Sequence, residues 1–466
     1  MNNPSEQHYD LVVIGAGPAG QKGAVQAAKL KKTVAIVERE SSPGGICLYT
    51  GTLPSKTLRA TVLLYQGFRK RTFRGISCSM SPEATLADLM YHKDSVIDHE
   101  RLIISDQLSR NSVRVIHGQA RLLDSHRVEV SGAQSAPTVL HGAFILIATG
   151  TRPTHPPYID AVVPPIYDSD TILQIKRIPR TLTVLGGGII GCEYACMFGA
   201  LGTRVTLVDR RKTLLQFMDD EIVAALCFQM RNMGMTLALG EEIDAVEVTG
   251  PDTVVTRLQS GTAITSEAVL SAAGRTACVE GIGLENVGVS LKNGNLIRVN
   301  ESFQTAVPHI YAAGDVIGFP SLASTSMDQG RIAVCHMFNH ATLSFSDLLP
   351  YGVYTIPEIS VVGKTEQQLT EQSVPYETGV ARFREIARGQ ILGETEGLLK
   401  LIFDRDTREL LGVHVIGEGA TELVHIGQAV IAHGGKIDYF VNTVFNYPTL
   451  AEAYKVAALN GINKLH

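Results

Sequence analysis

The chain contains two places where an apolar run leads directly into closely spaced glycines. Residues 10–20 read Asp-Leu-Val-Val-Ile-Gly-Ala-Gly-Pro-Ala-Gly, and residues 183–191 follow the same course. A short continuous apolar run predicts a buried parallel strand. Glycines in the order Gly-x-Gly-x-x-Gly after such a strand predict a tight turn that opens a helix and binds a dinucleotide.

The first motif has its three glycines at Gly15, Gly17 and Gly20. We expect a helix through about Leu30 and a second strand at residues 33–37, which ends at Glu38. This acid lies eighteen residues past the third glycine, where a carboxylate can accept hydrogen bonds from ribose hydroxyls. The glycines let the backbone approach a pyrophosphate, and the helix N-terminus supplies partial positive charge.

The second motif begins 171 residues later and repeats this order, with glycines at Gly186, Gly188 and Gly191. A strand at residues 204–208 then ends at Asp209, again eighteen residues past the third glycine. One such motif alone is weak evidence, because glycine turns are common. Two motifs in the same register favour two dinucleotide-binding domains over two ordinary turns.

The end of the chain shows a different pattern. A Ser-Asp-Leu-Leu-Pro connection at residues 346–350 leads into strand-like runs such as residues 398–403 and 411–416. Two helices are predicted at about residues 421–432 and 450–462. The whole pattern predicts an α/β protein with two Rossmann-like dinucleotide-binding domains and a C-terminal α+β domain.

Length and composition agree with this picture and exclude several classes of protein. A chain of 466 residues predicts about three domains, and 45% hydrophobic residues with 44 glycines fit a folded α/β enzyme. The net charge of −5, without a basic stripe, argues against nucleic acid as a partner. No segment approaches the roughly 18 apolar residues of a membrane span. Residues 1–9 are too polar for a signal peptide.

The seven cysteines are an odd number without metal-type spacing, so we expect no metal site and a location in the reducing cytoplasm. Cys192 and Cys196 lie four positions apart in an expected helix. Small buried thiols are the simplest interpretation of that pair.

Residues 44–56 carry the clearest chemistry: Gly-Gly-Ile-Cys-Leu-Tyr-Thr-Gly-Thr-Leu-Pro-Ser-Lys. This stretch resembles the flavin-side redox loop of the pyridine nucleotide-disulfide oxidoreductases, in which two cysteines five positions apart form a disulfide. Here Cys47 is present, but Thr52 occupies the second position. A lone thiol cannot form the internal disulfide that passes electrons to a dithiol substrate.

The resemblance extends from Tyr9 to about Leu465 and is closest to the soluble pyridine nucleotide transhydrogenase branch. The blocks that carry it are residues 51–56, 167–170, 314–324, 354–360 and 445–454. It implies FAD in the first domain and NAD or NADP in the second. The implied domains are residues 1–150 (FAD, first part), 151–274 (NAD(P)), 275–345 (completion of the FAD domain) and 351–466 (dimerisation).

The resemblance also assigns candidate binding residues. For FAD they are Gly15, Gly17, Gly20, Glu38, Arg39, Gly44, Gly45, Cys47, Thr52, Lys56, Ala120, Thr149, Gly150, Asp315 and Ala323, with Asp315 at the ribityl chain. For NAD(P) they are Gly186, Gly188, Gly191, Glu193, Asp209, Arg210, Arg211 and Gly274.

The candidate catalytic residues are Lys56, Glu193, Cys47, Thr52, Tyr447 and Glu452. The resemblance implies that Lys56 lies near flavin N5 and pairs with Glu193, where a cation favours the anionic reduced flavin. A solvated lysine at a helix start is the alternative. For Cys47 we favour flavin contact and packing over a reactive thiol.

A second departure from the family lies near the C-terminus. Disulfide reductases have a histidine just before a proline that corresponds to Pro448, and this histidine is the acid/base of dithiol chemistry. Here that position is Tyr447, while the glutamate that follows is kept as Glu452. A tyrosine titrates near 10 and is a poor proton shuttle at pH 7. An interface packing role and a direct role at the flavin both remain open for Tyr447.

The two departures together imply hydride exchange between NADPH and NAD. Without a disulfide, electrons would leave the flavin for a second nicotinamide in the same site, in a ping-pong cycle. Asp209 suits the ribose of NAD, and Arg210 and Arg211 suit a 2′-phosphate. A solvated loop is the alternative for the two arginines.

Other functions stay open at this point. They are a dihydrolipoamide-type disulfide reductase, if Cys78 or Cys335 reaches Cys47, a diaphorase or oxidase, and a redox-responsive flavoprotein scaffold. The resemblance further implies the Si-specific type of transhydrogenase and at least a homodimer. Higher oligomers or filaments also resemble this branch.

Overall fold

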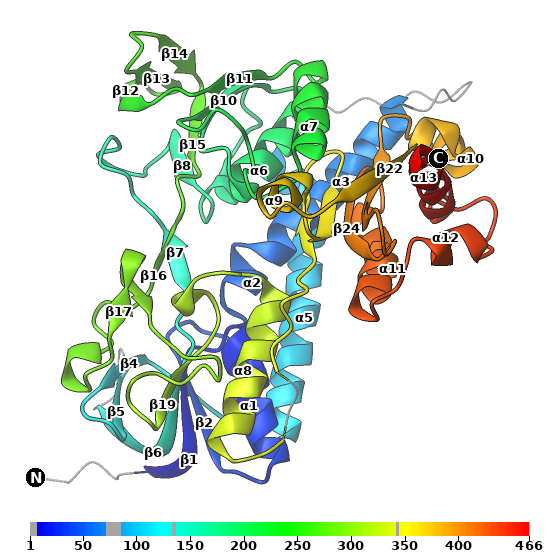
Figure 1. Cartoon of the computed structure of the whole chain (residues 1–466). Coiled ribbons are helices and arrows are strands. Elements are labelled where there is room, and N and C mark those ends of the chain that lie inside the picture. Colours follow the sequence, from blue (N-terminus) through cyan, green and yellow to red (C-terminus); the bar gives the residue numbers. More distant parts are fainter. Residues whose placement is uncertain (1–6, 71–84, 133–136, 342–343, 466) are drawn as a thin grey trace, which may run out of the picture. The chain divides into compact units, whose positions relative to one another are not determined.

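The computed structural model describes residues 7–70, 85–132, 137–341 and 344–465 (Figure 1). These residues divide into two compact units. The first unit consists of the described residues within Met1–Thr57, Met90–Thr154 and Gly274–Phe345. The second unit consists of the described residues within Leu58–Leu89, His155–Ala273 and Ser346–His466.

A seven-stranded sheet forms the centre of the first unit, in the order β3-β2-β1-β6-β5-β4, with β19 paired to β6. Its strands are β1 (Gln7–Ile14), β2 (Val34–Glu38), β3 (Arg114–His117), β4 (Gln119–Leu122), β5 (Arg127–Ser131), β6 (Thr138–Ile147) and β19 (Ile310–Ala312). β1, β2, β3, β6 and β19 are parallel, and β4 and β5 are antiparallel additions. The apolar end of β1, Leu11–Ile14, is buried because neighbouring strands and helices cover it on both faces.

Helices and small ribbons complete the first unit. They are α1 (Pro18–Lys29), α2 (Gly45–Tyr49), α5 (Tyr91–Arg110), α8 (Ala323–Met337), the pair β7 (Thr151–Pro153) and β16 (Arg275–Ala277), and the pair β17 (Leu291–Lys292) and β18 (Leu296–Ile297). α1 packs closely against α8 and also contacts α5. α3 (Thr52–Lys70) begins in the first unit and continues into the second.

The second unit contains a parallel five-stranded sheet, in the order β11-β10-β9-β15-β8. Its strands are β8 (Ile166–Asp168), β9 (Thr181–Leu185), β10 (Arg204–Asp209), β11 (Thr236–Leu239) and β15 (Ala268–Ser271). The accompanying elements are α6 (Ile189–Ala200), α7 (Asp220–Asn232) and an antiparallel ribbon of β12 (Ile243–Gly250), β13 (Thr253–Leu258) and β14 (Ala263–Ser266).

The same unit contains an antiparallel C-terminal sheet, in the order β20-β21-β24-β23-β22. Its strands are β20 (Tyr351–Val353), β21 (Ile359–Gly363), β22 (Tyr376–Arg382), β23 (Leu398–Asp404) and β24 (Leu410–Ile416). The helices are α4 (Leu86–Leu89), α9 (Glu366–Glu371), α10 (Ala387–Leu392), α11 (Ala420–Ala432), α12 (Asp438–Asn442) and α13 (Glu452–Ile462). Phe403, Phe440 and Tyr454 are buried in the core of this region.

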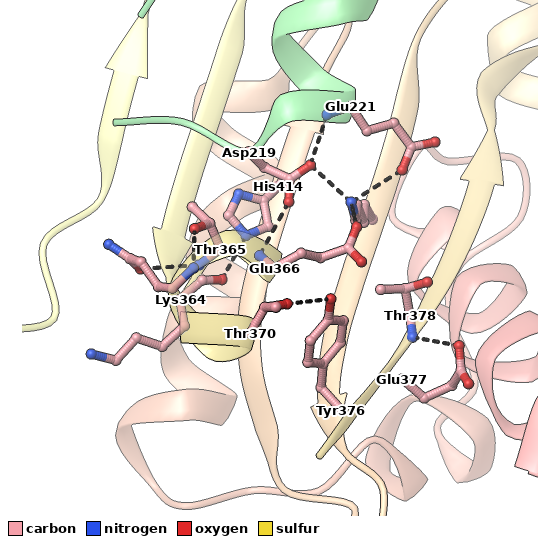
Figure 2. Close-up of polar contacts among 12 residues, drawn as sticks. Asp219, Glu221, Lys364, Thr365, Glu366, Thr370, Tyr376, Glu377, Thr378 and His414 are labelled. Atoms are coloured by element: carbon pink, nitrogen blue, oxygen red, sulfur yellow. Dashed lines mark hydrogen bonds and ion pairs between the residues drawn. The ribbon is translucent and has the colours of Figure 1, made fainter. Parts of the chain in front are cut away.

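A buried lysine joins the parallel and the C-terminal sheets within the second unit. Asp219, Glu221 and Glu366 point toward one another in Figure 2. The Lys400 ammonium forms an ion pair with each of their carboxylates. The Lys400 Nζ atom is 2.8 Å from Asp219 Oδ1 and 3.1 Å from Glu221 Oε2. Burial alone lowers the pKa of Lys400, but hydrogen bonds to Asp219 and Glu366 raise it above its ordinary value. The three carboxylates therefore hold a charged lysine on β23.

The elements predicted from the sequence are present, with small shifts at their ends. β2 begins at Val34 instead of Thr33, and α13 begins at Glu452 instead of Leu450. The fold class, two Rossmann-like regions with an α+β C-terminal region, is confirmed. Among the described residues, no helix combines the length and apolar character that a membrane crossing requires.

Candidate functional site

The two glycine turns have the same construction. Gly15 has a φ of +101° and Gly186 a φ of +112°, and a Cβ on either would collide with a backbone carbonyl, that of Ala148 or Ala272. The adjoining strand therefore comes close to each turn only because the residue is glycine.

The helices that follow these turns have a glycine at the N-cap position, Gly17 in α1 and Gly188 in α6, and no side chain among the described residues hydrogen-bonds their first amides as a cap. A Cβ on Gly17 would meet only Gly45 Cα at 4.0 Å, and one on Gly188 would meet nothing within 4 Å. There is therefore open space beside the N-cap glycine of each helix, where the pyrophosphate of a dinucleotide would fit.

The acids at the ends of β2 and β10 also repeat each other. Glu38 accepts the amide of Ala16 at 2.8 Å, and Asp209 accepts the amide of Gly187 at 2.5 Å. Both acids are buried. Each carboxylate is thus fixed beside its glycine turn. Glu38 also accepts the amide of Glu40 and keeps further lone pairs for ribose hydroxyls, whereas the Asp209 oxygens also accept hydrogen bonds from Arg211.

Arg211 binds Asp209 through two nitrogens of its guanidinium, one to each carboxylate oxygen. Its Nε atom is 2.9 Å from Asp209 Oδ1, and its Nη2 atom is 2.7 Å from Asp209 Oδ2. Burial alone would raise the pKa of Asp209, but the hydrogen bonds from Arg211 lower it below its ordinary value. Arg210 is exposed, and no ion pair joins it to another residue in the described ranges. The sequence predicted two arginine forks for a phosphate, whereas Arg211 is bound to a carboxylate here.

Cys47 lies on α2, and Thr52 begins α3. Cys47 is a free thiol, and the Thr52 side chain hydrogen-bonds it. Burial raises the pKa of Cys47, and the Thr52 hydrogen bond offsets only part of that increase. The thiol is therefore protonated at neutral pH, which favours contact and packing over a reactive thiolate. Cys335 is a buried free thiol on α8, and Cys78 lies outside the described residues.

Asp315 has two neighbours that the sequence did not identify. The Thr151 hydroxyl donates to Asp315 Oδ2 at 3.4 Å, and Arg275 Nε donates to Thr151 Oγ1 at 2.9 Å. Burial raises the pKa of Asp315, and Arg275 offsets part of that effect. The only sequence signal for Arg275 is its position directly after Gly274, a glycine with a φ of +120°.

Thr149 supplies a further test of whether the first unit fits FAD. Its Oγ1 atom is buried and has no hydrogen-bond partner among the described residues. A buried hydroxyl without a partner is costly, so a ligand that bonds it would stabilise the fold. Together with the uncovered N-terminus of α1, this hydroxyl fits a bound dinucleotide in the first unit.

The other predicted FAD residues are spread around the first unit. The Gly44 amide donates to the Ala16 carbonyl at 2.9 Å, which holds the loop of Gly44 and Gly45 against the first glycine turn. Ala120 is buried on β4, and Ala323 is the first residue of α8. The remaining predicted residues are Gly150, with a φ of +68°, and Arg39, which is exposed and 3.4 Å from Glu40.

Lys56 and Glu193 belong to different units, so their pairing remains a prediction. Lys56 is half-buried in the second turn of α3. Glu193 is buried on α6, and its Oε1 atom accepts the amide of Tyr354 at 2.8 Å.

Tyr447 and Glu452, the two candidate residues near the C-terminus, are not hydrogen-bonded to each other within the residues that the structure describes. Tyr447 is 73% exposed. Glu452 is the first residue of α13, and its Oε2 atom is buried without a hydrogen-bond partner in the described part of the chain. No hydrogen bond connects the two side chains in the described ranges, so this chain does not itself form an acid/base dyad there.

Comparisons with known proteins agree with this construction. Residues 9–330 match the family model described as pyridine nucleotide-disulphide oxidoreductase, and residues 349–458 match that family's dimerisation domain. A soluble pyridine nucleotide transhydrogenase of Mycobacterium tuberculosis (strain ATCC 25177 / H37Ra) is 49% identical over 460 residues, which cover 98% of each chain. Another, from Marinobacter nauticus, is 46% identical over 467 residues and covers 99% of this chain and 100% of its own.

Among solved structures, the HOCl-induced flavoprotein disulfide reductase RclA from Escherichia coli is similar, with a TM-score of 0.88 and 26% identity. The similarity covers 97% of this chain and 99% of that one. The chain therefore belongs to the pyridine nucleotide-disulphide oxidoreductases, in the group of the soluble pyridine nucleotide transhydrogenases.

Proposed function

We propose that this protein is a transhydrogenase that exchanges hydride between NADPH and NAD, with FAD bound in the first unit. The observation that carries the proposal is the free Cys47 thiol beside Thr52. A disulfide reductase needs a second thiol at this place to receive electrons and pass them to its substrate. The names of the relatives at 44–49% identity support the same activity.

Bound FAD supplies the hydride chemistry, because it accepts a hydride from a reduced nicotinamide and returns it to an oxidised one. The chain supplies binding and charge. The α1 N-terminus, Glu38, Thr149 and Asp315 would hold the cofactor. Lys56 would place a positive charge beside the ring system, and Glu193 would orient that lysine. The other predicted FAD residues would line the same site.

One nucleotide pocket must accept both coenzymes. Asp209 would bind the ribose hydroxyls of NAD, while Arg210 and Arg211 would face the 2′-phosphate of NADP. The Asp209 carboxylate alone would repel the phosphate of NADP. Because Arg211 forms an ion pair with Asp209, the pair is neutral and does not repel a phosphate. Gly186, Gly188, Gly191 and Gly274 would complete this pocket.

The dimerisation domain indicates self-association. We propose that the basic assembly is a homodimer, which can extend to a higher oligomer or a filament. We also propose the domain boundaries given in the sequence analysis.

The six cysteines in the described part of the chain are free thiols, which supports a location in a reducing compartment, the cytoplasm. We propose Si-specific stereochemistry for the hydride transfer. The test is to follow which deuterium is lost from NADPH that is labelled at one or the other C4 position.

Anaerobic stopped-flow spectroscopy tests the proposal. One equivalent of NADPH should bleach the flavin of the FAD-loaded protein, and NAD should then restore its colour with formation of NADH. Recovery with lipoamide, a quinone or oxygen, but not with NAD, would exclude the transhydrogenase. Absence of bleaching with either reduced coenzyme would favour a redox scaffold.

A further inference from the structure

The short segment between β20 and β21, residues 354–358, has hydrogen bonds to three helices of the second unit, α3, α6 and α11. We call it the tether loop. It carries part of the sequence block Tyr-Thr-Ile-Pro-Glu-Ile-Ser, to which the proposed function assigns no role. Thr355, Ile356 and Glu358 are buried.

The first contact comes from α6. The Glu193 carboxylate accepts the Tyr354 amide at 2.8 Å, and the Cys196 sulfur has a hydrogen bond with the backbone of Ile356. Glu193 and Cys196 are three residues apart, so they lie on the same face of the helix. The loop therefore fixes the face of α6 that presents the proposed partner of Lys56.

The second contact comes from α3. Arg59 Nε donates to the Thr355 carbonyl at 2.9 Å, and Nη1 is 3.0 Å from Glu358 Oε2. The Arg59 guanidinium also lies 5.7 Å from the centre of the Tyr354 ring. Arg59 and Glu358 have side-chain exposures of 10% and 8%. A buried guanidinium with this many partners holds the loop in one conformation.

The third contact comes from the start of α11. Glu358 Oε1 accepts the amide and the hydroxyl of Thr421 at 3.2 and 3.1 Å, and the Gly417 amide donates to the Glu358 carbonyl at 2.9 Å. Because both Glu358 carboxylate oxygens are bonded, Glu358 gives Arg59 a fixed anchor. Arg59 is also three residues after Lys56 on α3, one helical turn away.

We propose that Arg59 and Glu358 are positioning residues for hydride transfer: they fix the tether loop, and the loop fixes the Glu193 carboxylate. The inference rests on the proposed function, in which Glu193 serves the reacting site. Neither residue needs to touch substrate. Their loss would let the Tyr354 amide and Glu193 move together, and small misplacements of a reacting geometry lower rates by up to about 100-fold.

The test compares Arg59→Met and Glu358→Gln, singly and together, with Glu193→Gln and the FAD-loaded wild type. Lys400→Met is the matched control, because it also removes the charge of a buried ion pair in the second unit but does not touch the loop. Three quantities are measured: the rate of flavin bleaching at saturating NADPH, the apparent Kd of NADPH, and amide hydrogen exchange of the peptide that contains residues 354–358.

We expect Arg59→Met and Glu358→Gln to slow bleaching at least about 10-fold, with the Kd within about threefold of wild type. The double variant should be no slower than the worse single variant, because both residues act through one loop. Exchange at Tyr354 should accelerate in these variants, whereas Glu193→Gln keeps an acceptor oxygen for the Tyr354 amide and should change this exchange little. Lys400→Met should lower the melting temperature but keep the bleaching rate and the loop exchange close to wild type.

Bleaching at the wild-type rate in Arg59→Met, with faster loop exchange, would overturn the inference and leave the pair with a purely structural role. A wild-type rate in Glu193→Gln would overturn it too, while the proposed function would stand. Failure of the wild type to pass hydride from NADPH to NAD would remove the proposed function and this inference with it. If Arg59→Met does not fold, Glu358→Gln and Arg59→Lys decide, and Arg59→Lys should recover only part of the rate because lysine lacks the planar fork.

Discussion

The hydroxyl of Thr52 hydrogen-bonds the Cys47 thiol, so a cysteine at position 52 would bring a second sulfur beside the first. We expect Thr52→Cys to form a disulfide on oxidation. The chain has seven cysteines, so eight minus two, or six, thiols should titrate after denaturation without a reductant. Thr52→Ser is the control and should keep all seven thiols. Eight titrating thiols in Thr52→Cys would show that the two positions are not aligned for a bond.

The bond between Arg211 and Asp209 predicts a selective effect on NADPH. In Arg211→Met the Asp209 carboxylate stays anchored by the Gly187 amide but loses its counter-charge, so it repels a 2′-phosphate. We expect the KM of NADPH to rise about 10-fold or more and that of NADH to change by less than about threefold, since losing a charged hydrogen bond costs about 1.5–3 kcal/mol. Lys212→Met, which removes an exposed positive charge from the next position, is the control for a general loss of charge and should leave both KM values close to wild type. Equal effects on both coenzymes would contradict the assignment of Arg211 to the phosphate.

At the scale of elements, the Lys400 cluster joins α7 to β23 and predicts how stability depends on pH. Burial alone would raise the pKa of Asp219, but His414 and the Lys400 ammonium lower it below its ordinary value. A lowered carboxyl pKa contributes stability above the unfolded pKa, and this contribution is lost as the pH falls through the folded pKa. Stability of the wild type should therefore fall steeply below about pH 4.

Lys400→Met should cost about 3–5 kcal/mol at pH 7, because it leaves the Asp219 carboxylate buried without its cation. The folded pKa of Asp219 should rise at the same time, so the acid-induced loss of stability should become smaller. Urea unfolding between pH 3 and pH 7 measures both effects. Arg408→Met, which breaks a half-exposed ion pair with Asp438, is the control and should cost less than about 1 kcal/mol. Parallel pH profiles of Lys400→Met and wild type would contradict this account.

The two Rossmann-like motifs could be predicted because their signals are local. An apolar strand, three glycines and an acid lie within about 30 residues, and the structure shows the acid bonded back to its own glycine turn. The contacts of the tether loop could not be predicted in this way. Tyr354 hydrogen-bonds Glu193, which is 161 positions away, and Thr355 hydrogen-bonds Arg59, which is 296 positions away. No periodicity encodes such pairs, and the same holds for Thr151 and Arg275 beside Asp315.

At the scale of the whole molecule, the C-terminal region of a single chain leaves apolar side chains in solvent. Val444 is 89% exposed and Tyr447 is 73% exposed, in the stretch that leads to α13. This stretch lies within the matched dimerisation domain, residues 349–458. Exposed apolar side chains in a dimerisation domain are expected to be covered by a second copy, because burying them stabilises the assembly.

Val444→Asp should therefore shift the protein toward the monomer without unfolding it, since a charge buried in an interface without a partner is strongly unfavourable. Sedimentation velocity across a dilution series, with circular dichroism as the check on folding, measures this shift. Phe228→Asp on α7 is the matched control, because Phe228 is also exposed, at 56%, but lies outside the dimerisation domain. It should self-associate like the wild type. If Val444→Asp also matches the wild type at every dilution, residues 444–447 are not in the interface, and an interface packing role for Tyr447 is ruled out.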